Sequence, residues 1–253
     1  MRLVSDTWLV FLRSINQVIR NPLSILIGMA QPALYLVLFG PMLTSLAGVA
    51  GFPAGSGWQV YVPGLLVQLA LMGSGMAGFT VLPDIHTGVA ERIRVTPLSR
   101  SALLLGRVGQ QVAVFTAQAV VLVLAGVLFG LRAPVGGVLL GVLLAVLLSS
   151  ALAAASFSIA LRLPNEYLFA PVSTLLTLLL LLLSGALLPL DLAPGWLRAL
   201  AAANPVSHVV DAERALFLGH LVSSRTLVGT LVTVALVALC WLWGIRTFRR
   251  EHR

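Results

Sequence analysis

The stretch PVGGVLLGVLLAVLLSSALAAASFSIAL, residues 134–161, contains no charged side chain. A helix needs about 20 mostly apolar residues to cross the hydrocarbon core of a bilayer, so this stretch predicts a transmembrane helix. Similar runs occupy residues 23–46, 60–83, 103–131, 167–190 and 226–244. Such long continuous runs exclude a transmembrane β-barrel, whose strands alternate in hydrophobicity. We therefore predict an all-α, polytopic membrane protein with about six transmembrane helices.

The composition agrees with this class. The chain is 59% hydrophobic and only 9% charged, whereas a soluble domain carries about 25% charged residues. The formal net charge is +8, which in a soluble protein suggests a nucleic-acid partner. Here the basic residues lie in short stretches between the apolar runs, so the charge indicates membrane topology and no nucleic-acid binding.

The arginines predict the orientation. If both termini are cytoplasmic, twelve of the sixteen arginines face the cytoplasm and four face outward. Cytoplasmic loops carry an excess of basic residues, so this split favours cytoplasmic termini. The lack of lysine together with abundant Arg, Ala, Gly, Leu and Val suggests GC-rich coding, from which we expect a bacterial plasma membrane. The outward group consists of Arg132, Arg198, Arg214 and Arg225.

Several kinds of chemistry are missing from the sequence. All sixteen basic residues are arginine, and without lysine the chain cannot contain a P-loop for ATP or a Schiff-base lysine. The four histidines lack metal-ligand spacing, and Cys240 has no second cysteine to pair with. We therefore expect no cofactor, metal or catalytic residue on this chain.

The acidic residues fall outside the apolar runs or at their ends. Ionisable residues deep in a membrane are the usual mark of proton or ion coupling. Their absence from the middle of the runs argues against a carrier driven by protons or sodium. The acids considered are Asp84, Glu91, Glu166, Asp191, Asp211 and Glu213.

Three segments outside the runs have recognisable patterns. In residues 1–21, Trp8, Leu12, Ile15 and Ile19 recur at helical spacing, which predicts an amphipathic helix in the cytoplasmic interface. Residues 84–101 are the most polar stretch, and we interpret them as an element that docks a partner protein rather than a solvated loop. Residues 191–225 predict two short helices half-buried in the outer interface, which either gate an exit or cap the bundle.

Uncharged polar residues lie within the apolar runs. Hydrogen bonding between helices is the ordinary role of such groups in a bilayer, and the alternative is that some of them line a route for an amphipathic substrate. The candidates for this lining are Gln68, Gln111, Gln118 and Ser156.

The order and spacing of these features resemble the ABC-2-type exporter permeases, especially the daunorubicin-resistance and nodulation-type members, over essentially the whole chain. The residues that carry the resemblance are Asn21-Pro22, Gln31-Pro32, Tyr61-Val62-Pro63-Gly64, Gly88, Glu91, Arg92, Thr96-Pro97-Leu98-Ser99-Arg100, Ser184-Gly185, Pro189-Leu190, Trp196-Leu197, Asn204-Pro205 and Arg214. The chain departs from the family by having arginine where its coupling segment commonly has lysine.

The resemblance implies one ABC-2-type transmembrane domain over residues 1–253. It implies a permease that pairs with a second permease copy, identical or related, and with a separate ATPase chain that holds ATP and Mg²⁺. The ATPase-coupling residues would be Gly88, Glu91, Arg92, Arg94, Thr96, Pro97 and Arg100, and the outer gate would involve Pro189, Trp196, Asn204 and Pro205. The expected substrate is apolar or amphipathic, with a drug or antibiotic first and a lipid or lipid-linked glycan second.

Two readings from other classes stay open at this stage. If the chain is an integral membrane enzyme acting on lipid, it should be active alone, without an ATPase. If it is an accessory membrane protein, scrambling the sequence of the polar segment 84–101 should be tolerated.

Overall fold

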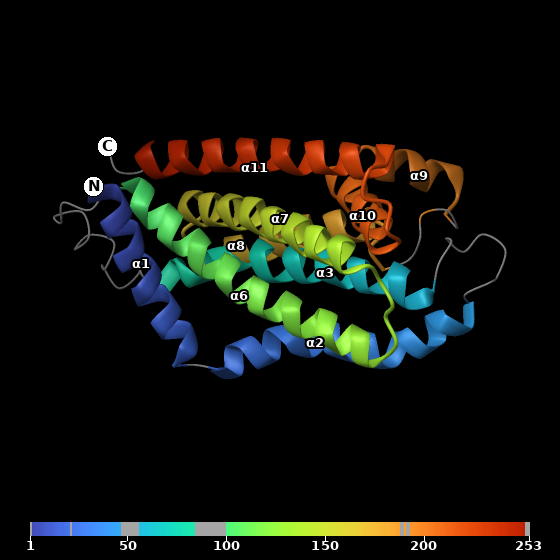
Figure 1. The fold of residues 1–253 in the computed structure, drawn as a ribbon. Helices are drawn as coiled ribbons and strands as arrows, with labels where there is room; N and C mark the ends of the chain where they lie inside the picture. Colours follow the sequence, from blue (N-terminus) through green and yellow to red (C-terminus); the bar gives the residue numbers. More distant parts are fainter. Residues whose placement is uncertain are drawn as a thin grey trace.

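A computed structural model describes residues 2–20, 22–46, 56–83, 100–187, 190 and 193–250. This described part consists of nine α-helices and one short 3₁₀ helix (Figure 1). In chain order they are α1 (Arg2–Ile19), α2 (Pro22–Leu46), α3 (Gly57–Gly75), the 3₁₀ helix η1 (Ala77–Thr80), α6 (Arg100–Leu128), α7 (Val135–Arg162), α8 (Glu166–Leu182), α9 (Gly195–Ala202), α10 (Pro205–Phe217) and α11 (Ser224–Arg250).

Local sequence sets where several helices begin and end. The side chains of Ser56, Asn165 and Asn204 each accept a backbone N–H at the start of the next helix, which satisfies a donor that has no partner within the helix. Gly130 has a φ of 106° just after α6, and Gly219 has a φ of 91° just after α10. These left-handed conformations cost glycine little, so both glycines end a helix and turn the chain.

The membrane-spanning prediction is confirmed in its main features. Four helical stretches are long and apolar enough to cross a membrane, namely Gly57–Thr80, Ser101–Leu128, Val135–Arg162 and Ser224–Phe248. Two shorter apolar helices, Leu26–Met42 and Glu166–Leu182, stand where the first and fifth runs were expected. The chain is thus a polytopic, all-α membrane protein, with four of the expected spans at full length in the described residues.

Two expected spans differ from continuous helices. In the second expected span, α3 ends at Gly75 and the chain continues as η1, where Gly73, Ser74 and Gly75 provide little side-chain support. In the fifth expected span, α8 ends at Leu182 and is followed by a turn in which Gly185 has a φ of 71°.

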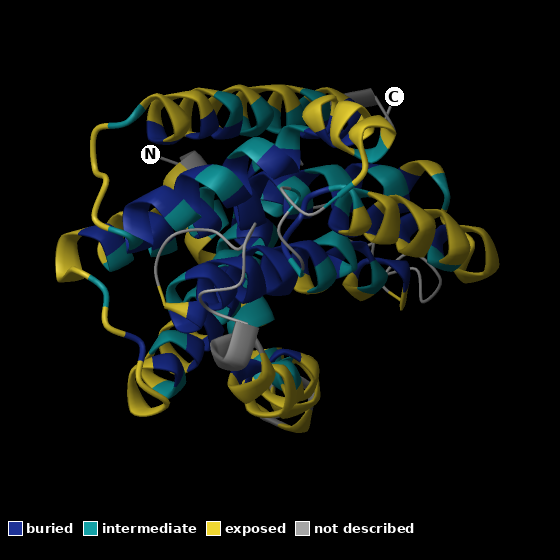
Figure 2. Ribbon diagram, turned by 90° about the vertical axis from the view of Figure 1, so that its right-hand side faces the viewer, coloured by how far each residue is buried: buried dark blue, intermediate teal, exposed yellow. Residues whose placement is uncertain are grey.

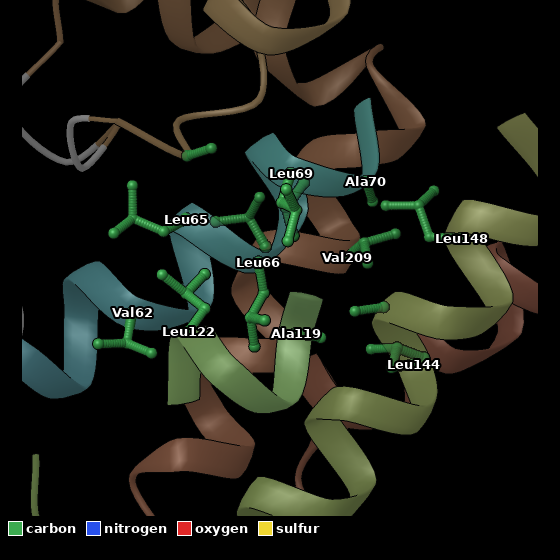
Figure 3. Close-up of a cluster of buried hydrophobic side chains, with 14 of the residues drawn as sticks. Val62, Leu65, Leu66, Leu69, Ala70, Ala119, Leu122, Leu144, Leu148 and Val209 are labelled. Carbon is green, nitrogen blue, oxygen red and sulfur yellow. The ribbon is translucent and has the colours of Figure 1, made fainter. Parts of the chain in front are cut away.

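α3 is the central helix. Of its most apolar window 78% is buried, compared with 17% for α11, and Figure 2 shows buried residues in the middle with exposed ones around them. In Figure 3, Leu66 of α3 lies near Leu122 of α6, and Ala70 of α3 lies near Leu148 of α7, and all four belong to one cluster of buried residues. Lipid tails are as apolar as leucine, so close packing rather than exclusion of water holds these helices together.

α1 crosses one end of the bundle at a steep angle to the long helices (Figure 1). It packs against α6, where a Cβ on Gly106 would lie 2.6 Å from Val10. Trp8 and Ile19, 57% and 64% exposed, lie on a different side of the helix. A helix is therefore present where the amphipathic one was predicted, and within the described residues Trp8 and Ile19 of its apolar stripe are exposed.

The outer segment differs from the expectation of two half-buried helices. α9 is mostly exposed, with Trp196 67% exposed, whereas α10 buries Val206, Val209 and Phe217 completely or almost so. α10 packs against α3, α7 and α11. It is therefore an integral part of the bundle, and its Arg214 donates to the backbone carbonyls of Val60 and Gly185.

The contact between α7 and α10 requires a glycine. A Cβ on Gly137 would lie 2.0 Å from the carbonyl oxygen of Leu216, whereas a Cβ on the neighbouring Gly136 would meet nothing within 4 Å. We predict that Gly137→Ala destabilises the protein by about 1–3 kcal/mol, the usual cost of overpacking. Gly136→Ala should leave stability unchanged. Thermal unfolding in detergent measures both, and equal midpoints for the two variants would contradict this packing.

Candidate functional site

The expected coupling segment falls mostly outside the described residues. This applies to Gly88, Glu91, Arg92, Arg94, Thr96 and Pro97, and Arg100 is the first residue of α6. The end of α3 that leads into η1 and the start of α6 lie at the same end of the bundle as α1 and the C-terminal end of α11 (Figure 1). The segment is therefore attached to the bundle at the end opposite to α9 and α10.

Close to this attachment, α3 loses its regular helical hydrogen bonds. The interruption, residues 75–80, is called here the α3 break. The Ser156 hydroxyl of α7 donates to the Gly75 carbonyl at 2.7 Å and accepts from the Gly78 N–H at 2.9 Å. One hydroxyl can do both, because it carries one donor and two lone pairs. Ser156 thus replaces the backbone partners that the break removes, which a membrane interior requires.

The α3 break is also tightly packed. A Cβ on Gly78 would lie 2.6 Å from the Phe169 ring of α8 and 2.9 Å from Ala160 of α7. Phe169 is fully buried and meets Phe79 edge-on at a centroid distance of 4.8 Å. The break is therefore a defined structure clamped between α7 and α8.

The α3 break is connected to α6 through an arginine. Arg107 Nη1 of α6 donates to the Thr80 carbonyl, the last residue of η1, at 3.2 Å. Arg107 directly follows Gly106, on which α1 packs. A force on the segment between η1 and α6 would therefore act on the α3 break, α6 and α1 together.

The polar residues expected to line a pathway have varied surroundings. Ser156 serves the α3 break, and Gln111 Nε2 donates to Ser74 Oγ at 3.5 Å. Gln118 is buried beside α2, and its Nε2 would lie 3.2 Å from a Cβ added to Gly28. Gln68 is 1% exposed, and both of its amide atoms lack a hydrogen-bond partner within the described residues.

Two of the four expected outer gate residues, Asn204 and Pro205, lie at the start of α10. Pro189 falls outside the described residues, and Trp196 is on the exposed α9. Pro205 is the first residue of α10. The Asn204 side chain accepts the Val206 N–H at 3.0 Å and donates to the Leu180 carbonyl of α8 at 2.8 Å. Asn204 therefore caps α10 and also connects it to α8.

Arg214 is the strongest polar anchor at this end, although the sequence suggested no role for it in the gate. Its Nε donates to the Val60 carbonyl of α3 at 3.2 Å. Its Nη2 donates to the carbonyls of Gly185 at 2.7 Å and Ala186 at 3.4 Å, just after α8. The planar guanidinium directs several N–H groups in fixed directions, so one side chain fastens α10 to two helices.

Residues 5–218 match the family model described as ABC-2 type transporter. The chain is 28% identical over 216 residues to "Putative transport permease ycf38" of Cyanophora paradoxa, covering 85% of this chain and 74% of the relative. It is 28% identical over 204 residues to the daunorubicin resistance ABC transporter permease protein DrrB1 of Streptomyces coeruleorubidus, covering 78% and 70%. It is 26% identical over 240 residues to "Probable doxorubicin resistance ABC transporter permease protein DrrC" of Mycobacterium tuberculosis H37Rv, covering 94% and 86%.

The α3 break yields a matched pair of serine variants. We expect Ser156→Ala to cost about 1–3 kcal/mol of stability, because it leaves the Gly75 carbonyl and the Gly78 N–H without partners. Ser158 is equally buried, but its hydroxyl donates only to the Ala154 carbonyl of its own helix. Ser158→Ala should therefore cost less than ~1 kcal/mol. Thermal unfolding in detergent separates the two, and a larger loss for Ser158→Ala would refute the assignment.

A second pair tests the anchor on α10. Arg214→Met keeps much of the length of the side chain and removes its donors, so we expect a loss of about 1.5–3 kcal/mol. Arg198 lies exposed on α9, and Arg198→Met should change stability by no more than ~0.5 kcal/mol. The readout is the unfolding midpoint, supported by the rate of proteolysis within residues 183–223. Equal behaviour of the two variants would show that Arg214 anchors nothing.

Proposed function

The chain belongs to the ABC-2 type transporter family as a membrane permease subunit, and from this premise we propose that it exports an apolar or amphipathic, drug-like molecule across the plasma membrane. As an ABC transporter permease it works with an ATPase subunit and is not itself catalytic. The ATPase is a separate chain in this proposal, because these 253 residues contain no lysine and hence no P-loop.

The proposed orientation places α1 and the C-terminal end of α11 in or at the cytoplasm. Their position at one end of the bundle requires an even number of crossings (Figure 1). Six crossings meet this requirement if α2 and α8 both traverse the bilayer beside the four longer spans. The excess of arginine in segments that would then face inward supports the same orientation.

The proposed coupling runs from the ATPase through residues 84–101 into the helices. That segment joins η1 to α6, and the Arg107 contact with Thr80 holds the two together. Closure of the ATPases would push the segment, and the helices attached to it would shift between inward- and outward-open arrangements. ATP drives this shift only through its different affinity for the two arrangements of the complex.

The substrate class follows from what the spans lack and from what the relatives' names say. No Asp, Glu or Lys occurs in the four full-length spans, so they offer no fixed negative charge. Two relatives carry names of daunorubicin and doxorubicin resistance permeases. A drug or antibiotic is therefore the proposed cargo, and lipid or lipid-linked glycan is the competing one.

A second permease copy completes the proposed pathway. α2 and α8 expose wide apolar faces on a single chain, with Leu26, Leu38 and Leu175 each about two-thirds exposed at 65%, 65% and 66%. Such faces are covered in a membrane by lipid or by another apolar helix.

The coupling proposal is tested by reversing charges in the polar segment. We expect Glu91→Arg combined with Arg92→Glu to reduce permease-stimulated ATPase activity and export about tenfold, if ~1.4 kcal/mol of docking free energy is lost. Arg225→Glu, at the start of α11 and at the other end of the bundle, is the control and should leave both activities intact. Both are measured after reconstitution with the ATPase. Unchanged stimulation in the double variant would refute the coupling role.

A further inference from the structure

Glu213 stands out among the buried polar residues of the chain. It is 0% exposed, and neither carboxylate oxygen has a hydrogen-bond partner within the described residues. It lies on α10, which is not one of the membrane-spanning helices. The sequence analysis placed this acid on a half-buried outer helix. The transport mechanism proposed above does not use it.

The elements that pack against α10 carry few charged side chains that could pair with Glu213. Residues 57–83 of α3 and η1 contain no charged side chain, and Tyr61 is their one titratable group. α7 has only Arg162, its last residue, while α10 meets its first turns at Gly137 and Gly141. On α9, Arg198 is exposed.

α11 and α10 itself supply the remaining groups. α11 begins with the exposed Arg225, and its Cys240, Arg246, Arg249 and Arg250 lie towards its opposite end. On α10, Asp211 and His208 are half-exposed. Arg214 is adjacent in sequence, but its guanidinium is directed at the carbonyls of α3 and of the turn after α8.

An ionised carboxylate in such surroundings is strongly unfavourable. Burying a charge without partners costs far more than a buried neutral group, so the group takes up a proton instead. Burial raises the pKa of Glu213 well above 4.5, and the nearby positive charge of Arg214 offsets this only in part. Burial and the lack of hydrogen-bond partners among the described residues therefore favour the protonated carboxyl while α10 is packed.

We propose that Glu213 is a proton-binding site by which the packing of α10 at the outer end of the bundle responds to the external pH. While α10 is packed, the carboxyl keeps its O–H bond. When α10 separates from the bundle, water solvates the carboxylate, and the proton leaves to the external solution. A proton must be taken up again before α10 repacks. The link to export rests on the proposed function, because it assumes that the outer end opens during transport.

The direction of the pH effect follows from the number of protons bound. The packed state binds one proton more than the open, solvated state between the ordinary pKa of the carboxyl and its raised value. The packed state is fully favoured below the ordinary pKa and loses ground as the pH rises. Within this window each pH unit shifts the equilibrium tenfold towards the open state.

The experiment measures opening directly and needs no substrate. Cys240→Ser removes the native thiol, and Val206→Cys places one thiol at a site on α10 that is 1% exposed. The rate of modification by a maleimide is measured between about pH 5 and pH 8 in this background and in the same background with Glu213→Gln. The ratio of the two rates cancels the pH dependence of the thiol itself.

The ratio, Glu213 over Glu213→Gln, should rise by up to tenfold per pH unit and then level off. Asp211→Asn is the control, since Asp211 is half-exposed and lies two residues away. In this variant the modification rate should keep the same pH dependence as in the background that retains Glu213. A ratio that stays flat over the range would overturn the proposal. If Asp211→Asn lost the pH dependence as Glu213→Gln does, Glu213 would not be the group responsible for it.

A second readout does not depend on any variant folding well. Infrared spectroscopy of the unmodified permease should show a protonated carboxyl band at neutral pH, where exposed carboxyls are ionised. Its absence would overturn the proposal. If the maleimide ratio behaves as expected but ATP and the ATPase do not change it, the proton site stands and the proposed transport role fails.

Discussion

The rest of the structure depends on one constraint, which is that backbone N–H and C=O groups inside a bilayer need partners within the protein. Continuous helices meet it in α6, α7 and α11. Where α3 stops being regular, the Ser156 hydroxyl supplies both a donor and an acceptor. The same constraint explains why Arg214 points its N–H groups at backbone carbonyls after the end of α8. At both of these places, irregular backbone is accompanied by a side chain that supplies the missing partner.

The central helix is held at both ends in the same way. Arg214 donates to the Val60 carbonyl near the start of α3, and Arg107 donates to the Thr80 carbonyl at the end of η1. Arg214 belongs to the outer segment and Arg107 to the helix that follows the polar segment. α3 is thus connected to the two regions for which gating and coupling are proposed, and most of its apolar window is buried between them. A displacement of α3 along its axis would strain both contacts.

Apolar run length was enough to predict the helices, since α2, α3, α6, α7, α8 and α11 lie where the runs are. The interruption after Gly75 was not predictable, because Ser74 and Gly78 also fit close packing in a regular helix. The burial of α10 was hidden for another reason. The carbonyls that accept hydrogen bonds from Arg214 are 154 and 29 residues away, so the mixed polar pattern suggested a half-buried interfacial helix. For the coupling segment and Pro189, the sequence pattern is still the only evidence.

The shortness of α8 has a consequence for the surrounding lipid. Its 17 residues rise about 25 Å, less than the ~30 Å of a typical hydrocarbon core. Most of its surface is uncovered, with Leu168, Leu179 and Leu182 all more than half exposed. If α8 crosses the bilayer as proposed, acyl chains beside it have to shorten or tilt to match it, which costs fractions of a kcal/mol per Å of mismatch. The apolar stretch Leu26–Met42 of α2 is equally short, so bilayer thickness would act on this protein mainly at these two helices.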